Sequence, residues 1–461
     1  MHPIQKSTIL IMLLRKLWMN RSLPLLRQPA TSKGLVTSAS RLPTILPADA
    51  LIEEERIPGY DPKRFLPVKP GDLLDNRYKI LVKIGWGSTS TVWLAQDTRR
   101  WWWSPNRYVT VKVTASDCVD DDAAKHERII TQHLTKNPSH DGFSFVRTML
   151  DNFEVPGQDG PHLCLVYEPM REPLWLFQRR WDNGRLPPAL FKVYLKFLLR
   201  GLDYLHSECH IIHTDLKLDN ILLGFEHPSV IENFVKKQAK NPMPRKIKDG
   251  RSIYLSQNDF GPPKSFRILP KIADFGLAQS GEGSEPRMHP IQPPIFHAPE
   301  VILGTSWTYS VDIWNLGVLI WNMMEGRDLF THIRSSQGNY SVQAHLAEMI
   351  ALLGASPKIL IDREIRWSEV KWSHAVPNRE GKLCQTAREY YGGPFFNSQG
   401  KFMHMDLIPT GVSLDKSVLS LQEEEKHLFL EFIKKMLQWL PEDRKTAKEL
   451  LEDPWLQEKT T

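Results

Sequence analysis

One short stretch of the chain carries the residue types that a phosphoryl transfer needs. His213–Asn220 reads His-Thr-Asp-Leu-Lys-Leu-Asp-Asn, and an Asp-Phe-Gly tripeptide begins later at Asp274. Asp215 can accept the proton of a hydroxyl nucleophile, and Lys217 can stabilise charge on the transferred group. The oxygens of Asn220 and Asp274 suit a hard divalent cation such as Mg²⁺. The pattern predicts metal-assisted transfer of a phosphoryl group to a hydroxyl.

A glycine-rich turn between two strand-like runs supplies a candidate nucleotide-binding element. Gly85 and Gly87 permit close approach of the backbone to phosphate groups, and Ser90 stands where a third glycine would be expected. This match alone is weak, because a plain β-turn has the same composition. The residues predicted to contact ATP here are Ile84, Gly85, Trp86, Gly87, Ser88, Thr89, Ser90 and Val92.

A lysine and a glutamate downstream of this turn form a candidate phosphate clamp. Lys112 lies in the strand-like run Val109–Val113, and by parity it shares a face with Thr110 and Thr114. A surface lysine is the alternative for this residue on its own. After a glycine-rich turn, Lys112 is predicted to neutralise the α and β phosphates, held by Glu127 from a helix.

The apolar run Leu163–Tyr167 is typical of a buried strand, and it leads into a segment predicted to connect a first and a second lobe of the fold. We expect adenine to hydrogen-bond to the backbone at Glu168 and Met170, with Tyr167 at the back of the pocket. This assignment depends on position, because backbone recognition leaves little trace in the sequence.

The elements that must position these residues change character along the chain. Residues 78–168 alternate apolar and polar positions in short runs, with one helical stretch around Ala123 to Leu134, whereas helical periodicity dominates after Pro187. An α+β protein with a small, mainly β lobe and a larger, mainly α lobe is predicted. Its parts are a basic extension over 1–48, a linker over 49–75, a first lobe over 76–170 and a second lobe over 171–458 with an insertion at about 224–269.

Composition limits the classes of partner and compartment. The formal net charge of +6 is a small excess over 461 residues and gives no argument for direct nucleic-acid binding. No apolar run approaches the roughly 20 residues of a membrane span. The cysteines show no metal-ligand spacing, which suits a reducing compartment. Residues 1–48 are basic and lack acidic residues, and two interpretations stay open: a mitochondrial transit peptide or a basic tail.

Two further segments are unusual in composition. Lys236–Arg251 is a cationic run in the insertion, interpreted as a solvated surface or as an anion-docking patch. The neighbouring Ser252–Ser256 alternates like a strand, so we expect part of the insertion to be ordered. Trp101–Trp103 is either a partner-binding patch or a half-buried aromatic loop.

With these motifs in hand, residues 76–458 resemble the eukaryotic protein kinases. Two more motifs carry the resemblance, Ala298-Pro299-Glu300 and the run from Asp312 to Gly317. The resemblance implies that Glu300 pairs with Arg444, that Asp312 braces the catalytic loop, and that Mg-ATP is the donor. Lysine at position 217 is typical of the serine/threonine class.

Within that class the chain looks most like the SR-protein kinases, especially shorter fungal relatives. The features that carry this likeness are the glycine-rich run from Gly85 to Ala95, His-Thr-Asp at 213–215, the insertion, and Phe395-Phe396-Asn397. The likeness implies regulation of mRNA processing through Arg/Ser-rich protein substrates, a monomer, and a nuclear or cytoplasmic location. The compartment stays open, because residues 1–48 point to mitochondria.

Three departures from the family pattern bear on regulation and specificity. Thr214 replaces the arginine that grips a phosphorylated activation loop, which predicts a constitutively competent enzyme. His297 stands where the SR-protein kinases carry an arginine, and residues 371–422 hold no dense acidic cluster that would dock an Arg-rich substrate.

Alternatives to a protein kinase are a catalytically dead scaffold of the same fold and a small-molecule phosphotransferase of the choline or aminoglycoside type.

Overall fold

The computed structural model describes residues 42–57, 59–99, 107–116, 121–265 and 267–457, and the side chains at 121–124 are outside this description. Residues 1–41 and Trp101–Trp103 therefore lie outside the described residues. The chain divides into two compact units. Unit 1 contains the residues up to 132, residues 147–173 and residues 222–271; unit 2 contains residues 133–146, residues 174–221 and the residues from 272 on.

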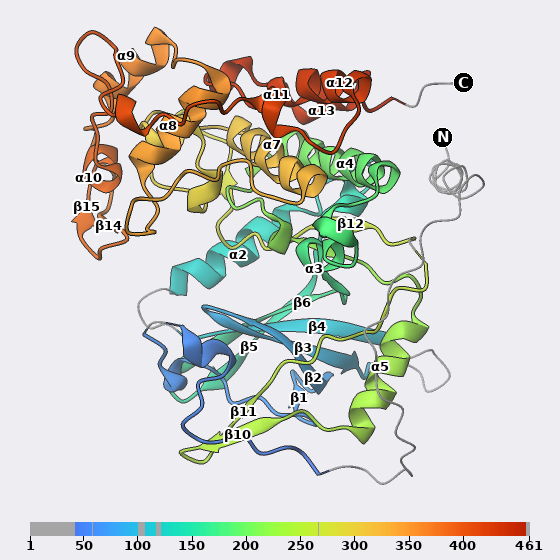
Figure 1. Cartoon of the computed structure of the whole chain (residues 1–461). Coiled ribbons are helices and arrows are strands. Elements are labelled where there is room, and N and C mark those ends of the chain that lie inside the picture. The colour runs from blue at the N-terminus through green and yellow to red at the C-terminus, as the bar shows by residue number, and fades with distance from the viewer. Residues whose placement is uncertain (1–41, 58, 100–106, 117–120, 266, 458–461) are drawn as a thin grey trace. The chain divides into compact units, whose positions relative to one another are not determined.

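Unit 1 is built on an antiparallel six-stranded sheet (Figure 1). In spatial order its strands are β1 (Leu73–Leu74), β2 (Tyr78–Gly87), β3 (Ser90–Asp97), β4 (Arg107–Thr114), β6 (Gly160–Tyr167) and β5 (Met149–Gly157). The helix α2 (Asp121–His133) follows β4 in the chain. Val109, Val111 and Val113 are buried in the core, whereas Lys112 is only partly buried, as the alternation in sequence predicts.

The insertion packs into unit 1. It contains α5 (Ser229–Lys240), β10 (Arg245–Lys248) and β11 (Arg251–Tyr254), and α5 lies against β2. The core of the sheet includes Ile231, Phe234, Met243 and Tyr254 from this segment. The expectation that part of the insertion is ordered is confirmed. The sequence range predicted for the second lobe includes this insertion, whereas its apolar side chains pack in the core of unit 1.

The segment predicted as a linker is also part of unit 1. Its 3₁₀ turn Glu53–Arg56 places Glu54 Oε2 2.6 Å from Lys83 Nζ and Glu55 Oε2 2.6 Å from Lys246 Nζ. Both lysine side chains are at most 1% exposed. Buried charges need partners, so these two ion pairs fix the segment to β2 and β10. Lys246 shows that the cationic run is not entirely a solvated surface.

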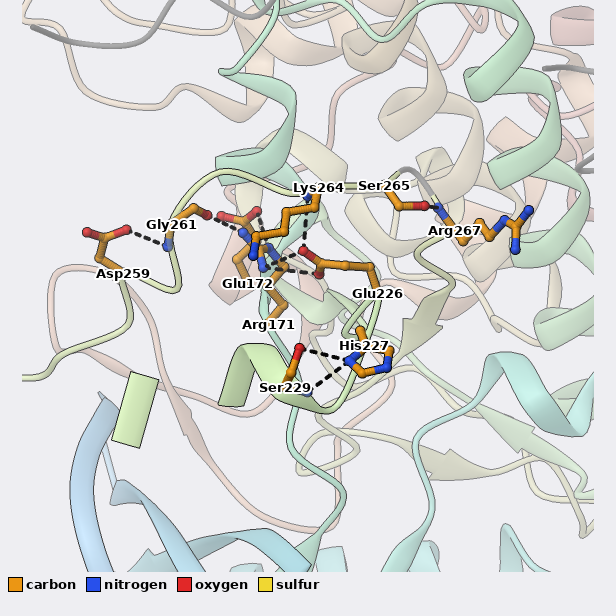
Figure 2. A network of polar contacts seen from close by, with 10 residues as sticks. All are labelled: Arg171, Glu172, Glu226, His227, Ser229, Asp259, Gly261, Lys264, Ser265 and Arg267. Atoms are coloured by element: carbon orange, nitrogen blue, oxygen red, sulfur yellow. Dashed lines mark hydrogen bonds and ion pairs between the residues drawn. The ribbon is translucent and has the colours of Figure 1, made fainter. Parts of the chain in front are cut away.

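A buried arginine closes the base of the insertion (Figure 2). Arg171 Nη1 lies 3.2 Å from Glu226 Oε2, Arg171 Nε lies 3.4 Å from Glu172 Oε1, and Nη2 donates to the carbonyl of Gly261. The three charged side chains are between 1% and 4% exposed. The backbone of Arg171 also donates to Leu223 O at 2.7 Å, where β7 (Glu172–Pro173) pairs with β9 (Ile221–Leu223).

Unit 2 is mainly helical. Its helices are α3 (Leu174–Gln178), α4 (Pro188–Asp203), α6 (Pro299–Ile302), α7 (Ser310–Glu325), α8 (Val342–Leu353), α9 (Lys358–Trp367), α10 (Ala387–Tyr391), α11 (Leu414–Ser417), α12 (Glu423–Lys434) and α13 (Ala447–Leu451). The remaining short strands are β8 (Ile211–Ile212), β12 (Pro270–Ile272), β13 (Gln279–Ser280), β14 (Val376–Pro377) and β15 (Leu383–Cys384). Single helical turns occur in unit 1 at Pro62–Arg64 and in unit 2 at Phe143–Phe145, Asp182–Gly184, Tyr204–Glu208, Leu218–Asn220, Pro294–Phe296, Met405–Leu407 and Pro441–Asp443.

Two long helices form the centre of unit 2 (Figure 1). The apolar stripe of α4 that the sequence predicts is buried, from Phe191 to Leu202. α7 packs against it and is buried on almost all sides, including the charged Asp312. A helix that is apolar all round belongs in a core, and Asp312 must therefore have a dedicated partner there. None of the described helices combines the length and apolar character that a membrane span requires.

Candidate active site

The segment His213–Asn220 of unit 2, predicted to be catalytic, follows β8 and is fixed by Asp312. The Oδ2 atom of Asp312 accepts from the backbone N–H of His213 at 2.7 Å, and Oδ1 accepts from that of Thr214 at 2.9 Å. Asp312 Oδ2 also lies 2.9 Å from His206 Nε2. The carboxylate thus satisfies buried backbone donors of an irregular loop.

The loop brings Asp215, Lys217 and Asn220 together. Lys217 Nζ lies 3.0 Å from Asp215 Oδ1 and 2.7 Å from Oδ2, and Asn220 Nδ2 donates to Oδ2 at 2.8 Å. A carboxylate offers about four lone-pair positions over its two oxygens. Among the described residues Oδ1 accepts from Lys217, so it retains a lone pair that can accept a further hydrogen bond.

Asp274 lies in the segment next to Asn220. The backbone N–H of Ala273 donates to Asn220 O at 2.8 Å, which sets Asp274 beside this loop in unit 2. Asp274 and Thr214 both have positive φ angles, 65° and 62°. Such angles are costly for residues with side chains and are concentrated at functional sites.

The oxygens of Asn220 and Asp274 fit the ligand preferences of Mg²⁺. Asn220 uses its amide N–H groups toward Asp215, so its Oδ1 is the atom suited to a cation. Mg²⁺ takes one or two carboxylate or amide oxygens and completes its shell with water and phosphate oxygens. Among the described residues no cluster of three or more His, Cys, Asp or Glu forms a separate metal site.

Thr214 contacts the segment that follows Asp274. Its Oγ1 donates to the carbonyl of Leu277 at 2.8 Å, and β13 pairs with β8 through Gln279 and Ile212. Thr214 therefore binds a backbone carbonyl through its neutral hydroxyl, where an arginine would need a charged partner.

The far end of this segment is anchored by a buried ion pair. Arg444 Nη1 and Nη2 each lie 2.6 Å from an oxygen of Glu300, and both side chains are fully buried. This is the pairing that the family resemblance implies. The preceding His297 is buried, with Nδ1 2.9 Å from the hydroxyl of Tyr340.

In unit 1 the structure brings Lys112 and Glu127 together. Lys112 Nζ lies 2.8 Å from both oxygens of Glu127, whose side chain is 7% exposed. Glu127 Oε1 also accepts from the hydroxyl of Tyr167 at 3.3 Å. The sequence placed Tyr167 at the back of the pocket but gave no sign of this hydroxyl contact.

The glycine-rich run forms a two-residue hairpin turn. β2 ends at Gly87 and β3 begins at Ser90, so Ser88 and Thr89 are the turn residues. A bulge precedes Gly85, and the turn is held from β4 because Ala115 N–H donates to Thr89 O at 2.7 Å. The tip of the hairpin is exposed at Trp86, Ser88 and Thr89.

The segment Glu168–Met170 offers backbone groups to a ligand. Met170 is buried, and among the described residues its backbone N–H has no hydrogen-bond acceptor. A backbone N–H without an acceptor in the protein can donate to a ligand, here the predicted adenine. The carbonyl of Glu168 accepts from Arg147 Nη2 at 2.9 Å and retains a second lone pair. No sequence motif identifies Arg147.

Comparison with known proteins decides the family. The model of the protein kinase domain matches residues 78–456. This chain belongs to the protein kinase family. A serine/threonine protein kinase of Aspergillus fumigatus is 37% identical over 415 residues, which cover 89% of this chain and 92% of the relative. The kinase is therefore a serine/threonine protein kinase.

Further relatives confirm the predicted resemblance to SR-protein kinases. The serine/threonine-protein kinase SRPK of Physarum polycephalum is 27% identical, over 88% of this kinase and 91% of its own length. SRSF protein kinase 3 of Mus musculus is 35% identical over 42% of this kinase and 35% of its own length. A crystal structure of another kinase domain, 22% identical with a TM-score of 0.61, covers 86% of this kinase and all of that chain, and it confirms the bilobal fold.

Proposed function

We propose that this kinase transfers the γ-phosphoryl group of Mg-ATP to serine or threonine in Arg/Ser-rich proteins. The observation that carries the proposal is the Asp215 carboxylate, held by Lys217 and Asn220 with one acceptor position still available. Bound Mg-ATP supplies the transferable phosphoryl group and the charge-neutralising cation.

In this proposal the residues of unit 2 act on the acceptor side of the reaction. Asp215 orients the substrate hydroxyl and accepts its proton, while Lys217 stabilises negative charge as the transfer proceeds. Asn220 and Asp274 would hold the magnesium ions through oxygen atoms. Asp312 keeps the loop rigid, so this geometry costs little reorganisation.

The residues of unit 1 would bind the nucleotide. Lys112, oriented by Glu127, would neutralise the α and β phosphates. The backbone of the hairpin that contains Gly85 and Gly87 would approach the same phosphates. The N–H of Met170 and the carbonyl of Glu168 would hydrogen-bond to adenine.

The substrate class comes from the relatives that are named SRPK and SRSF protein kinase. Residues 371–422 form no concentrated acidic surface that would dock an Arg-rich substrate. Asp415 lies 3.3 Å from Lys426, and the same stretch contains several lysines and arginines. His297 is buried and does not offer a surface charge. An Arg/Ser-repeat peptide and a generic basic protein must therefore be compared directly.

The test is phosphate incorporation from labelled ATP with Mg²⁺ into both substrates. Asp215→Asn should lower kcat by about 10²–10⁴-fold, because the proton acceptor is lost. The matched control is Asp219→Asn, an exposed aspartate in the same loop, which should keep full activity.

Three outcomes separate the parts of the proposal. Equal labelling by wild type and Asp215→Asn would overturn the catalytic assignment. Labelling of the generic substrate alone would reject the Arg/Ser class while keeping the kinase. Preferential labelling of the Arg/Ser peptide supports the full proposal. The comparisons give no support to a dead scaffold or a small-molecule phosphotransferase.

A further inference from the structure

We propose that Tyr167 is a positioning residue of the phosphate clamp, whose hydroxyl orients Glu127 and through it Lys112. This inference deepens the proposed function and depends on it, because it assumes that Lys112 contacts the nucleotide phosphates.

The three side chains form a continuous hydrogen-bonded chain within unit 1. Tyr167 Oη donates to Glu127 Oε1 at 3.3 Å, and Glu127 holds Lys112 through both carboxylate oxygens at 2.8 Å. Tyr167 and Glu127 are 4% and 6% exposed. Donors on two sides of the buried carboxylate favour one rotamer, and without the hydroxyl the contact with Lys112 would be the one of these two restraints that remains.

Neighbouring strands hold Lys112 and Tyr167 in register. Lys112 on β4 pairs across the ladder with Leu165 on β6, and Thr110 pairs with Tyr167 itself. Lys112 and Tyr167 therefore lie on adjacent strands within two residues of each other along the ladder. Glu127 reaches both of them from α2, so a single carboxylate bridges helix and sheet.

Arg147 fixes the other side of Tyr167. Its guanidinium lies over the Tyr167 ring, 4.5 Å from the centroid, while Nη2 donates to the carbonyl of Glu168 at 2.9 Å. A cation over an aromatic face restrains the ring orientation. The residue that aims its hydroxyl at Glu127 is thus covalently next to the proposed adenine-binding carbonyl.

This arrangement predicts which ligands bind more weakly when the Tyr167 hydroxyl is removed. Lys112 would contact phosphates, so the affinity for ADP should depend on the orientation of Glu127, whereas the affinity for adenosine should not. Hydrogen bonds to charged groups are the stronger class, and we expect Tyr167→Phe to raise the Kd for ADP about tenfold. The Kd for adenosine should stay unchanged.

The experiment measures Mg-ADP and adenosine binding by calorimetry on the full chain. Tyr254→Phe is the matched control, since Tyr254 is a buried tyrosine of the same unit whose hydroxyl accepts from Arg245 at 3.3 Å. It should change neither affinity. A thermal melt of each variant verifies that it is folded.

The remaining variants separate this inference from the proposed function. Lys112→Met should weaken ADP and spare adenosine; if ADP binding were unaffected, the proposed nucleotide site itself would fail. If Lys112→Met weakens ADP and Tyr167→Phe does not, the positioning role alone is rejected. A parallel loss of adenosine affinity in Tyr167→Phe would also reject it, because the effect would then arise at the adenine-binding segment. In Glu127→Gln the further change to Tyr167→Phe should have less than its single-variant effect.

Discussion

At the scale of single residues, two histidines of unit 2 are kept neutral by burial. Burial lowers the pKa of His297 to about 3, with a smaller contribution from the positive charge of Arg379, and burial also holds the pKa of His345 well below its ordinary value. The Tyr340 hydroxyl lies between them, 2.9 Å from His297 Nδ1 and 3.0 Å from His345 Nδ1. The Tyr340 hydroxyl can donate to one of these Nδ1 atoms only while that ring is neutral, and its oxygen can accept from the N–H of the other ring.

The folding stability of unit 2 should therefore fall in acid. In the unfolded chain His297 protonates below pH about 6.5, whereas the folded state resists until about pH 3. Below pH 6.5 the unfolded state binds more protons, so the free energy of unfolding decreases by about 1.4 kcal/mol per pH unit for His297 alone. Urea unfolding between pH 7 and 5 measures this slope. His297→Gln should reduce it, and the exposed His427→Gln should not; equal slopes in all three proteins would contradict the argument.

At the scale of elements, the insertion and residues 42–57 act as structural parts of unit 1. Buried ion pairs join these segments to their neighbours: Glu54 pairs with Lys83 of β2, Glu55 with Lys246 of β10, and Glu226 with Arg171 before β7. A buried ion pair gains little over an apolar contact, but removing one partner leaves an uncompensated charge. These pairs therefore select one placement of each segment.

Arg171→Met should destabilise unit 1. The substitution removes the cation that pairs with the buried Glu226, and losses of about 3–5 kcal/mol are typical for a broken buried pair. The control is Arg267→Met, an exposed arginine of the same insertion that lies away from this cluster in Figure 2. Equilibrium urea unfolding of both variants tests this, and equal stabilities would show that the cluster contributes nothing.

At the scale of the whole molecule, the segment from Asp274 to Glu300, which corresponds to the activation segment of protein kinases, is held by contacts that need no phosphate. The contacts are the Thr214 hydroxyl with Leu277, the pairing of β13 with β8, and the buried pair of Glu300 with Arg444. In kinases switched by phosphorylation, a charged residue at the position of Thr214 must find a phosphate. A neutral hydroxyl that binds backbone has no such requirement.

Phosphatase treatment should consequently leave the activity of this kinase unchanged. The measurement compares kcat before and after treatment. Mass spectrometry verifies that Ser280 and Ser284, the serines between Asp274 and Glu300, carry no phosphate. A large loss of activity on dephosphorylation would contradict the prediction and would indicate that another basic residue binds a phosphorylated segment.

Much of this protein is determined by local sequence. The family, the bilobal α+β fold and the serine/threonine class follow from short motifs such as His213–Asn220 and Ala298–Glu300, and from the apolar stripe of α4. These signals are legible because loop chemistry needs fixed spacings and helix burial needs a fixed period. The roles of Asp215, Lys217 and the other site residues stay predictions until the variants are assayed.

Only the tertiary structure decided which distant residues meet. Composition suggested that Glu53–Glu55 belong to a linker and that Lys236–Arg251 form a solvated surface, yet Glu55 and Lys246 are buried against each other. Neither periodicity nor spacing shows that Tyr167 reaches Glu127, or that Arg171 closes the insertion. Such contacts arise because a buried charge or hydroxyl must find a partner, and which partner is near depends on how the whole sheet and its insertion pack.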